Sequence, residues 1–192
     1  MQNDAEAAER NRLTADLIER GHDFALSGSS GASYLDPKVH RHWPHVRKKL
    51  SSGHRFRLLL TDPFSEATKI RNTLNGVASE LDPKLDLDNL ARLLVVFPSL
   101  QVRFTDQVYC SVFFTEHDMV YDPYHLGQVF DRLENRFFAL QLDERVDTTG
   151  ASYFQQLKNH FEFLWSEGQD WAEFVAEHPH LVVDQRAPVS DE

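Results

Sequence analysis

Residues 55–61, Arg-Phe-Arg-Leu-Leu-Leu-Thr, constrain the fold of this chain more than any other stretch. A short apolar run of this kind, flanked by basic residues, is typical of a strand that is buried in the middle of a sheet. Segments with apolar residues at helical spacing lie before and after it, over residues 5–20, 67–81 and 85–97. We therefore expect a β-sheet with residues 55–61 inside it.

Further apolar segments complete the predicted sheet. The additional strands are expected at residues 24–27, 100–105, 108–115 and 137–142. Glu116, His117 and Asp118 form a polar turn after residue 115, so this part of the chain is predicted to be a β-hairpin. A wide apolar stripe after Tyr153 indicates a closing helix. The order of these elements predicts an α/β fold with a mixed β-sheet flanked by helices on both faces.

The length of the chain, 192 residues, suits one hydrophobic core. We expect a single α/β domain over residues 1–185 and a disordered tail over residues 186–192. No apolar run approaches the roughly 20 residues that a membrane helix needs, and the first ten residues are polar, so we expect a cytoplasmic protein with no membrane partner. Cys110 is the one cysteine, which excludes an intrachain disulfide.

Lysine and arginine concentrate between residues 38 and 71. This segment holds nine of the 20 basic residues and two carboxylates, a net charge of +7; because the whole chain carries −10, the remainder carries −17. A basic face on an acidic body can bind an anionic small molecule while discouraging indiscriminate binding to nucleic acid. The alternative is that the same basic residues form only a solvated helix face and strand ends. Nucleic acid binding is left open, and a homodimer is possible.

Small and polar residues follow two of the predicted strands. Gly28 begins a Gly-Ser-Ser-Gly turn whose backbone amides could face an anion, although such turns are commonly structural. Asp62 ends the next strand, Ser65 can cap a helix, and Arg71 lies in that helix. Ligands of open α/β sheets bind outside the carboxyl ends of strands, near helix N-termini. These residues are therefore candidate ligand contacts.

No metal or cofactor is expected from the sequence. The Gly-Ser-Ser-Gly turn lacks the lysine of a P-loop and the full dinucleotide fingerprint. A helix is predicted to begin at Asp36 and Pro37, and it carries His42 and His45 three residues apart. No carboxylate lies between Lys38 and Arg55 to complete a ligand set, so we interpret them as solvated histidines.

These segments together resemble the phospholipase D-like domain found in bacterial effector and regulatory proteins. The resemblance covers residues 24–165 and rests on a strand ending in Ser-Gly, a strand reading LLLTDP, a helix carrying Arg71, an apolar hairpin and the closing helix HFEFLW. It implies a phosphodiester-binding histidine and lysine, as His-x-Lys, on the first hairpin strand, with an aspartate at the turn. Here Tyr109 and Ser111 occupy the first two positions and Glu116 lies near the third, so the catalytic motif is missing.

His125 is the one candidate for relocated chemistry. It follows Tyr124 at the far end of the hairpin, and histidine suits acid, base or nucleophilic work near neutral pH. A hydrogen-bonded structural corner is the alternative reading of the same residues.

Two functions from different classes follow. The first is a non-catalytic sensing or interaction domain that binds a small phosphorylated or nucleotide-like ligand in a bacterial regulatory or defence context. The alternative is a phosphodiesterase or nuclease with a nonstandard active site centred on His125. The residues expected at the ligand are Ser27, Gly28, Ser29, Asp62, Ser65, Arg71, Ser111, Tyr124 and His125. The missing His-x-Lys favours the first function.

Overall fold

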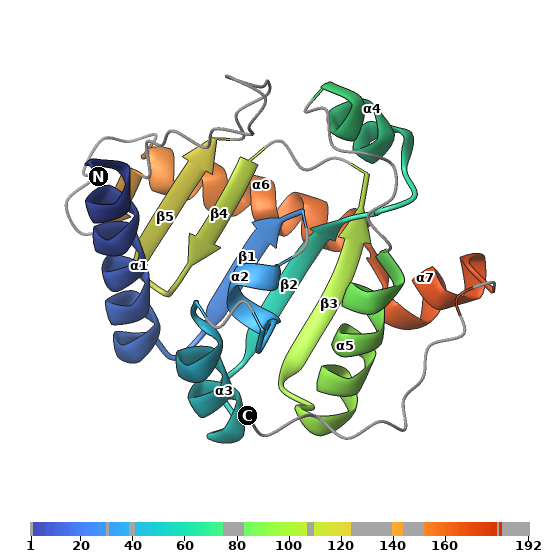
Figure 1. Ribbon diagram of the computed structural model, residues 1–192, viewed down its shortest axis with the longest axis horizontal. Coiled ribbons are helices and arrows are strands. Elements are labelled where there is room, and N and C mark those ends of the chain that lie inside the picture. Colours follow the sequence, from blue (N-terminus) through green and yellow to red (C-terminus); the bar gives the residue numbers. More distant parts are fainter. Residues whose placement is uncertain are drawn as a thin grey trace.

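The computed structural model describes residues 2–29, 31–38, 41–74, 83–106, 110–123, 140–143, 152–179 and 181. The helices are α1 (Gln2–Arg20), α2 (Ala32–Leu35), α3 (Trp43–Ser51), α4 (Glu66–Leu74), α5 (Pro83–Val96), α6 (Tyr153–Glu167) and α7 (Trp171–Glu177). The strands are β1 (Phe24–Gly28), β2 (Phe56–Thr61), β3 (Leu100–Thr105), β4 (Cys110–Phe114), β5 (Asp118–Pro123), β6 (Leu140–Asp143) and β7 (Gln169–Asp170). Figure 1 shows their arrangement.

All of these strands lie in one mixed sheet, in the order β6-β5-β4-β1-β2-β3-β7. β1, β2 and β3 are parallel neighbours, whereas β4 runs antiparallel to β1 and begins the hairpin with β5. The strand predicted at residues 55–61 is β2, and it lies between β1 and β3 as expected. The predicted α/β class, with a mixed sheet and helices on both faces, is confirmed.

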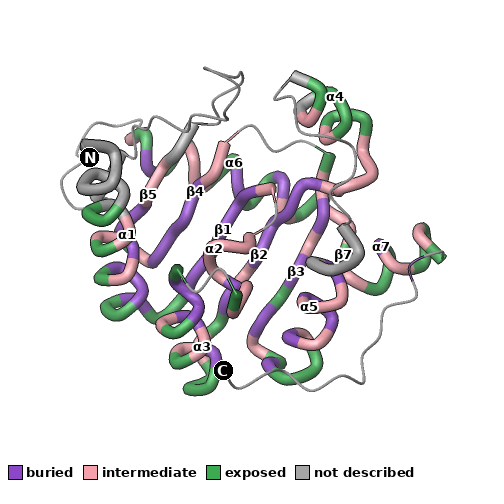
Figure 2. The backbone as a smooth tube through the Cα atoms, in the orientation of Figure 1, coloured by how far each residue is buried: buried purple, intermediate pink, exposed green. Residues whose placement is uncertain are grey.

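The two faces of the sheet bury separate hydrophobic clusters. Phe56, Leu58 and Leu60 of β2 point to the face that α1, α2, α3, α5 and α7 cover, while Leu59 points to the face that α6 covers. This alternation follows from the two-residue period of a strand. Because β2 is covered on both sides, its side chains are largely buried, and the central strands in Figure 2 are mostly purple.

The sequence missed the edge strand β7. Its two residues pair antiparallel with β3, through Arg103 opposite Asp170 and Phe104 opposite Gln169. Two polar residues between α6 and α7 carry no strand pattern, so their pairing depends on where α6 ends relative to β3.

Two helical predictions need correction. The helix expected to begin at Asp36 begins at Trp43 instead, with Pro44 in its first turn, where the missing amide hydrogen costs nothing. The apolar stripe expected over residues 67–81 includes Ile70 of α4, but Ile70 is 60% exposed and does not belong to the core. Figure 1 shows α4 beyond the ends of the strands rather than along the sheet, so the sheet does not cover its apolar stripe.

None of the helices in the described part of the chain combines the length and apolar character needed to cross a bilayer. The predicted limits of one domain, and the tail over residues 186–192, lie partly or wholly outside the described ranges and stay predictions.

Candidate functional site

A partly open cavity of about 60 Å³ lies between α2, α5 and the carboxyl ends of β2 and β3. Its described lining residues are Ser29, Ala32, Leu35, Asp36, Leu60, Thr61, Pro63, Leu87, Asn89, Leu90 and Phe104. The cavity occupies the sheet edge where open α/β proteins bind ligands.

The turn after β1 places α2 over this cavity. Gly31 precedes α2 with φ 68°, a left-handed conformation that glycine adopts at no steric cost. A Cβ atom at Gly31 would also lie 3.2 Å from Cδ1 of Leu58. Asn89 of α5 then ties the two helices together, because its Nδ2 donates a hydrogen bond to the Leu35 carbonyl oxygen at 3.2 Å. Glycine at this turn therefore allows α2 to pack closely over the sheet and form one wall of the cavity.

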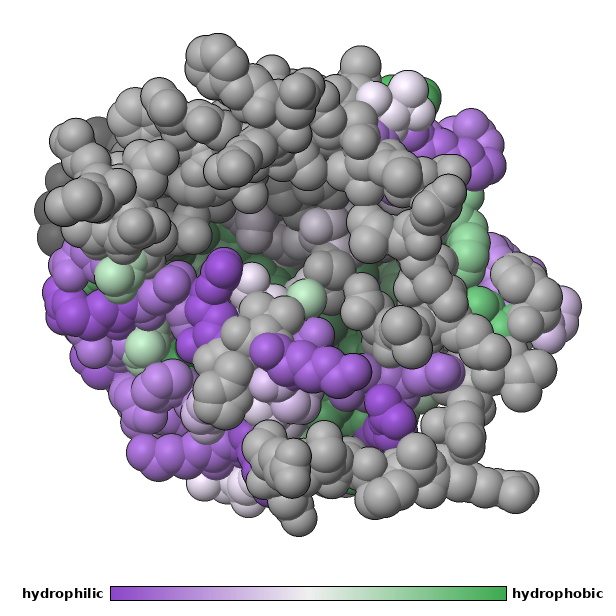
Figure 3. Space-filling view, viewed as in Figure 1, coloured by the Kyte–Doolittle hydropathy of each residue, from purple (hydrophilic) through white to green (hydrophobic). Residues whose placement is uncertain are grey.

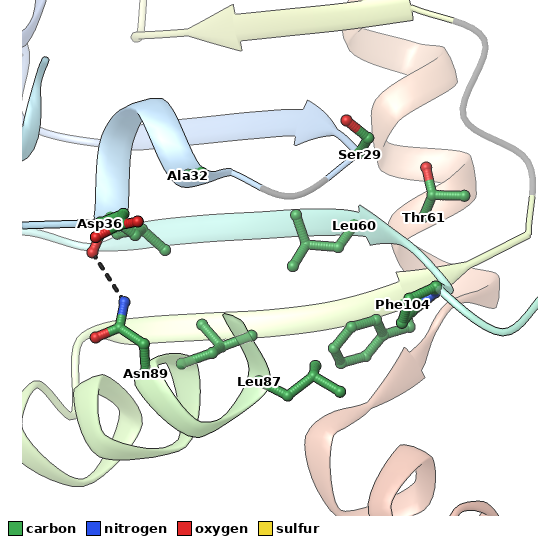
Figure 4. A pocket seen from close by; sticks show the side chains of 11 residues that line it. Ser29, Ala32, Asp36, Leu60, Thr61, Leu87, Asn89 and Phe104 are labelled. Atoms are coloured by element: carbon green, nitrogen blue, oxygen red, sulfur yellow. Dashed lines mark hydrogen bonds between the residues drawn. The ribbon is translucent and has the colours of Figure 1, made fainter. Parts of the chain in front are cut away.

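Polar groups lie at the two ends of the cavity and apolar groups between them. Figure 4 shows Asp36 and Asn89 at one end, Ser29 and Thr61 at the other, and Leu60, Leu87 and Phe104 along the wall.

Thr61 lies at the end of β2, and the alternation of the strand turns its side chain toward the α6 face, as for Leu59, rather than into the cavity. It is only 7% exposed, yet its hydroxyl oxygen is buried without a hydrogen-bond partner in the described part of the chain. An unpaired buried hydroxyl is costly, and such groups are found where a ligand or water completes the bonding.

Asp62 and Ser65, two of the predicted ligand contacts, form hydrogen bonds within the turn between β2 and α4. The Asp62 carboxylate accepts a hydrogen bond from the Phe64 amide at 2.7 Å. The Ser65 hydroxyl donates to the Asp62 carbonyl and accepts from the Thr68 amide at 3.2 Å, so the predicted cap of α4 is present. Neither Asp62 nor Ser65 is among the described residues that line the cavity, and the side chain of Arg71 lies outside what is described.

The ligand contacts predicted at the end of β1 lie on different faces of the sheet. Ser29 lines the cavity, and Gly28 is the last residue of β1. Ser27 instead lines a second, much smaller cavity of about 10 Å³ beneath α6, together with Cys110 and His160. The sheet therefore brings Ser29, but not Ser27, to the larger cavity.

Of the candidate residues in and around the hairpin, the structure describes Ser111. Ser111 lies in β4 opposite Asp122 of β5. β5 runs parallel to β1 and ends at Pro123, opposite Cys110, so it ends on the edge where β1 ends. Tyr109, Tyr124 and His125 lie outside the described residues, and their roles stay predictions.

Glu116 lies at the opposite end of the sheet. One of its carboxylate oxygens accepts hydrogen bonds from the backbone amides of His22 and Asp23, at 2.8 and 2.7 Å. Partial burial would raise the pKa of Glu116, but the backbone hydrogen bonds outweigh it and hold this pKa below its ordinary value. Glu116 therefore fixes the start of β1, away from the cavity.

Many of the basic residues between 38 and 71 pair with the acidic body of the protein. Lys48, Arg55, Arg57 and Lys69 form ion pairs with Glu19, Asp23, Glu162 and Glu66, respectively. Lys49 donates to the carbonyls of Glu19 and Gly21 at the end of α1. Figure 3 shows hydrophilic residues gathered over α1 and α3, where several of these contacts lie. Four of the nine basic residues of this segment therefore have a carboxylate partner.

Histidine and carboxylate side chains form no metal cluster in the described ranges, since none gathers three potential ligands. His45 pairs with Glu19, with 2.9 Å between Nδ1 and Oε1. This contact and that of Lys48 lower the pKa of Glu19.

Three polar residues of the cavity were missed by sequence reasoning: Asp36, Thr61 and Asn89. The sequence predicts Asp36 at the start of a helix and Thr61 at the end of a strand, and Asn89 lies within the helix predicted over residues 85–97. A polar residue directly after the apolar run of β2 was the available signal for Thr61. Asp36 and Asn89 line the same cavity only because α2 and α5 pack side by side, which no local pattern reveals.

Comparisons with known proteins add a fold likeness. No protein-family model matches the chain, and no curated protein matches its sequence. Among solved structures, it is similar to TrmBL2, an archaeal chromatin protein whose structure shows a novel mode of DNA binding, with 14% identity and a TM-score of 0.51. The match covers 83% of this chain and 49% of that one. A phosphatidylserine synthase of Haemophilus influenzae Rd KW20 matches with 14% identity and a TM-score of 0.49, over 88% of this chain and 38% of the synthase.

These likenesses concern the fold alone. This chain spans about half of TrmBL2 and less of the synthase.

Proposed function

We propose that this chain is a non-catalytic, phospholipase D-like ligand-binding module of a regulatory protein, and that the cavity between α2, α5 and the ends of β2 and β3 is its binding site. The observation that carries the proposal is the cavity itself, with apolar walls and the side chains of Asp36 and Asn89 at one end. A concave, mainly apolar site with a few polar groups is typical of small-molecule binding.

The residues at the catalytic positions of the resemblance support a non-catalytic role. Tyr109 and Ser111 stand where the resemblance implies a histidine and a lysine, and they supply neither the imidazole nucleophile nor the positive charge. Glu116, near the position of the aspartate, uses its carboxylate to hold the backbone of His22 and Asp23.

The regulatory context is supported by the likeness to half of TrmBL2, a DNA-binding protein. A domain that occupies part of such a chain can report ligand binding to another part. The pairing of Lys48, Arg55, Arg57 and Lys69 with carboxylates leaves these cations poorly placed to contact phosphates themselves.

The second candidate is a phosphodiesterase centred on His125. The direction of β5 favours it, because this strand leads toward Tyr124 and His125 from the sheet edge where β1 ends. Such a centre would take His125 as nucleophile or general base.

A thermal-shift screen of small molecules tests the proposal with a matched pair of variants. Ala32→Leu places a larger side chain in the cavity, whereas Ala67→Leu makes the same change on the exposed surface of α4. A saturating ligand should raise the Tm of the wild type and of Ala67→Leu by about 5–10 °C, and that of Ala32→Leu much less. Equal shifts in all three proteins would place binding elsewhere. Hydrolysis of bis(p-nitrophenyl) phosphate that His125→Ala abolishes would favour the phosphodiesterase instead.

A further inference from the structure

We infer that the cavity takes a small amphiphilic amine, with its nitrogen at Asp36 and Asn89 and its apolar part along Leu60, Leu87 and Phe104. This inference rests on the proposed function and names the ligand class of that site. It replaces the phosphorylated ligand expected from the sequence with one of opposite charge.

The end of the cavity formed by α2 and α5 offers hydrogen-bond acceptors. One oxygen of the half-buried Asp36 carboxylate accepts from the Lys38 amide at 2.8 Å, and the other has no hydrogen-bond partner among the described residues. The Asn89 amide uses its Nδ2 on the Leu35 carbonyl, which leaves its Oδ1 as an acceptor. A carboxylate oxygen without a hydrogen-bond partner favours a ligand group that donates hydrogen bonds and carries positive charge.

The charge of the lining argues in the same direction. Asp36 is the one ionisable residue among the described lining residues, which include no lysine, arginine or histidine. An anion there would lose water and face a negative charge without a paired cation, which is strongly unfavourable in apolar surroundings. An ammonium group in the same place would instead be attracted by the Asp36 carboxylate.

The walls set the size and character of the remaining part. Leu60, Leu87 and Phe104 are nearly fully buried, and the cavity holds about 60 Å³. That space suits a branched alkyl group of a few carbons, whose burial is favourable in proportion to its apolar area.

Three probes with one branched alkyl skeleton test this inference: isoamylamine, isoamyl alcohol and isovalerate. Binding is measured by titration of protein with 13C-labelled leucine methyls, because Leu60, Leu87 and Leu90 line the cavity and report occupancy directly. At neutral pH the amine should bind about fivefold tighter than the alcohol, the effect expected of a partly exposed ion pair, and isovalerate should be weakest.

Asp36→Asn provides the decisive variant, since its side-chain oxygen can still accept from the Lys38 amide. It should bring the amine to the affinity of the alcohol, while Asp16→Asn, the same change on the exposed side of α1, should leave the ratio unchanged. Equal binding of amine and alcohol by the wild type, or tightest binding of isovalerate, would overturn the amine inference but leave the cavity as a ligand site. Unperturbed leucine methyls with all three probes would contradict the proposed function as well.

Discussion

The guanidinium of Arg57 on β2 forms a two-pronged ion pair with the carboxylate of Glu162 on α6, with both N–O distances at 2.7 Å. The Arg57 guanidinium also lies over the rings of Phe161 and Trp165, at 5.1 and 5.5 Å from their centroids. The Arg57 side chain is 18% exposed and that of Glu162 is 46% exposed, so this pair joins α6 to the middle of the sheet in a partly exposed setting. The hydrogen bonds from Arg57 hold the pKa of Glu162 below its ordinary value.

Removing Glu162 should therefore destabilise the protein. We expect Glu162→Ala to lower the free energy of unfolding by about 1–2 kcal/mol, because it leaves the Arg57 cation partly buried and unpaired. Glu66→Ala removes an exposed ion pair to Lys69 on α4 and should change the stability by less than about 0.5 kcal/mol. Urea denaturation of the three proteins measures both effects, and equal losses would mean that the Arg57 pair adds nothing beyond a surface contact.

Glu116 should contribute a pH-dependent part of the stability. Its pKa is lowered in the folded state, so its contribution is fully present above the ordinary value of 4.5 and is lost as the pH falls through the lower folded value. We expect Glu116→Gln to cost about 1 kcal/mol at pH 7, because a charged acceptor bonds the amides of His22 and Asp23 more strongly than a neutral one. Thermal unfolding between pH 3 and 7 should show the wild type converging on the variant below pH 4.5. A gap of constant size across this range would exclude the carboxylate charge as its cause.

The sequence predicted those features whose pattern is local. The apolar runs located β1, β2, β3 and β4, and the polar turn at Glu116 located the hairpin, because strand burial and turns depend on neighbouring residues. The ion pair of Arg57 with Glu162 joins residues 105 positions apart, and no spacing in the sequence predicts it. The cavity likewise depends on how α2 and α5 pack together.

The helix α4 shows the limit of periodicity most clearly, and it gives a direct test. An apolar stripe predicts which side of a helix is apolar but not whether anything covers it, and here Ile70 is 60% exposed while Leu93 of α5 is fully buried. Ile70→Ala should therefore change the free energy of unfolding by less than about 0.5 kcal/mol. Leu93→Ala should cost about 2–5 kcal/mol through lost burial and the cavity left behind. A large loss in Ile70→Ala would show that α4 packs against another surface in solution.

Thr61 allows a test of the cost of a buried hydroxyl group. Its hydroxyl is buried without a partner among the described residues, and valine has nearly the same shape without the hydroxyl. Thr61→Val should therefore raise the free energy of unfolding of the protein by about 1 kcal/mol, which corresponds to about 2–4 °C in Tm for a chain of this size.

Scanning calorimetry measures the stability effect of Thr61→Val. A higher Tm in the variant would support a hydroxyl that is buried without a partner. A lower Tm would mean that the hydroxyl already has a partner in solution, such as an ordered water.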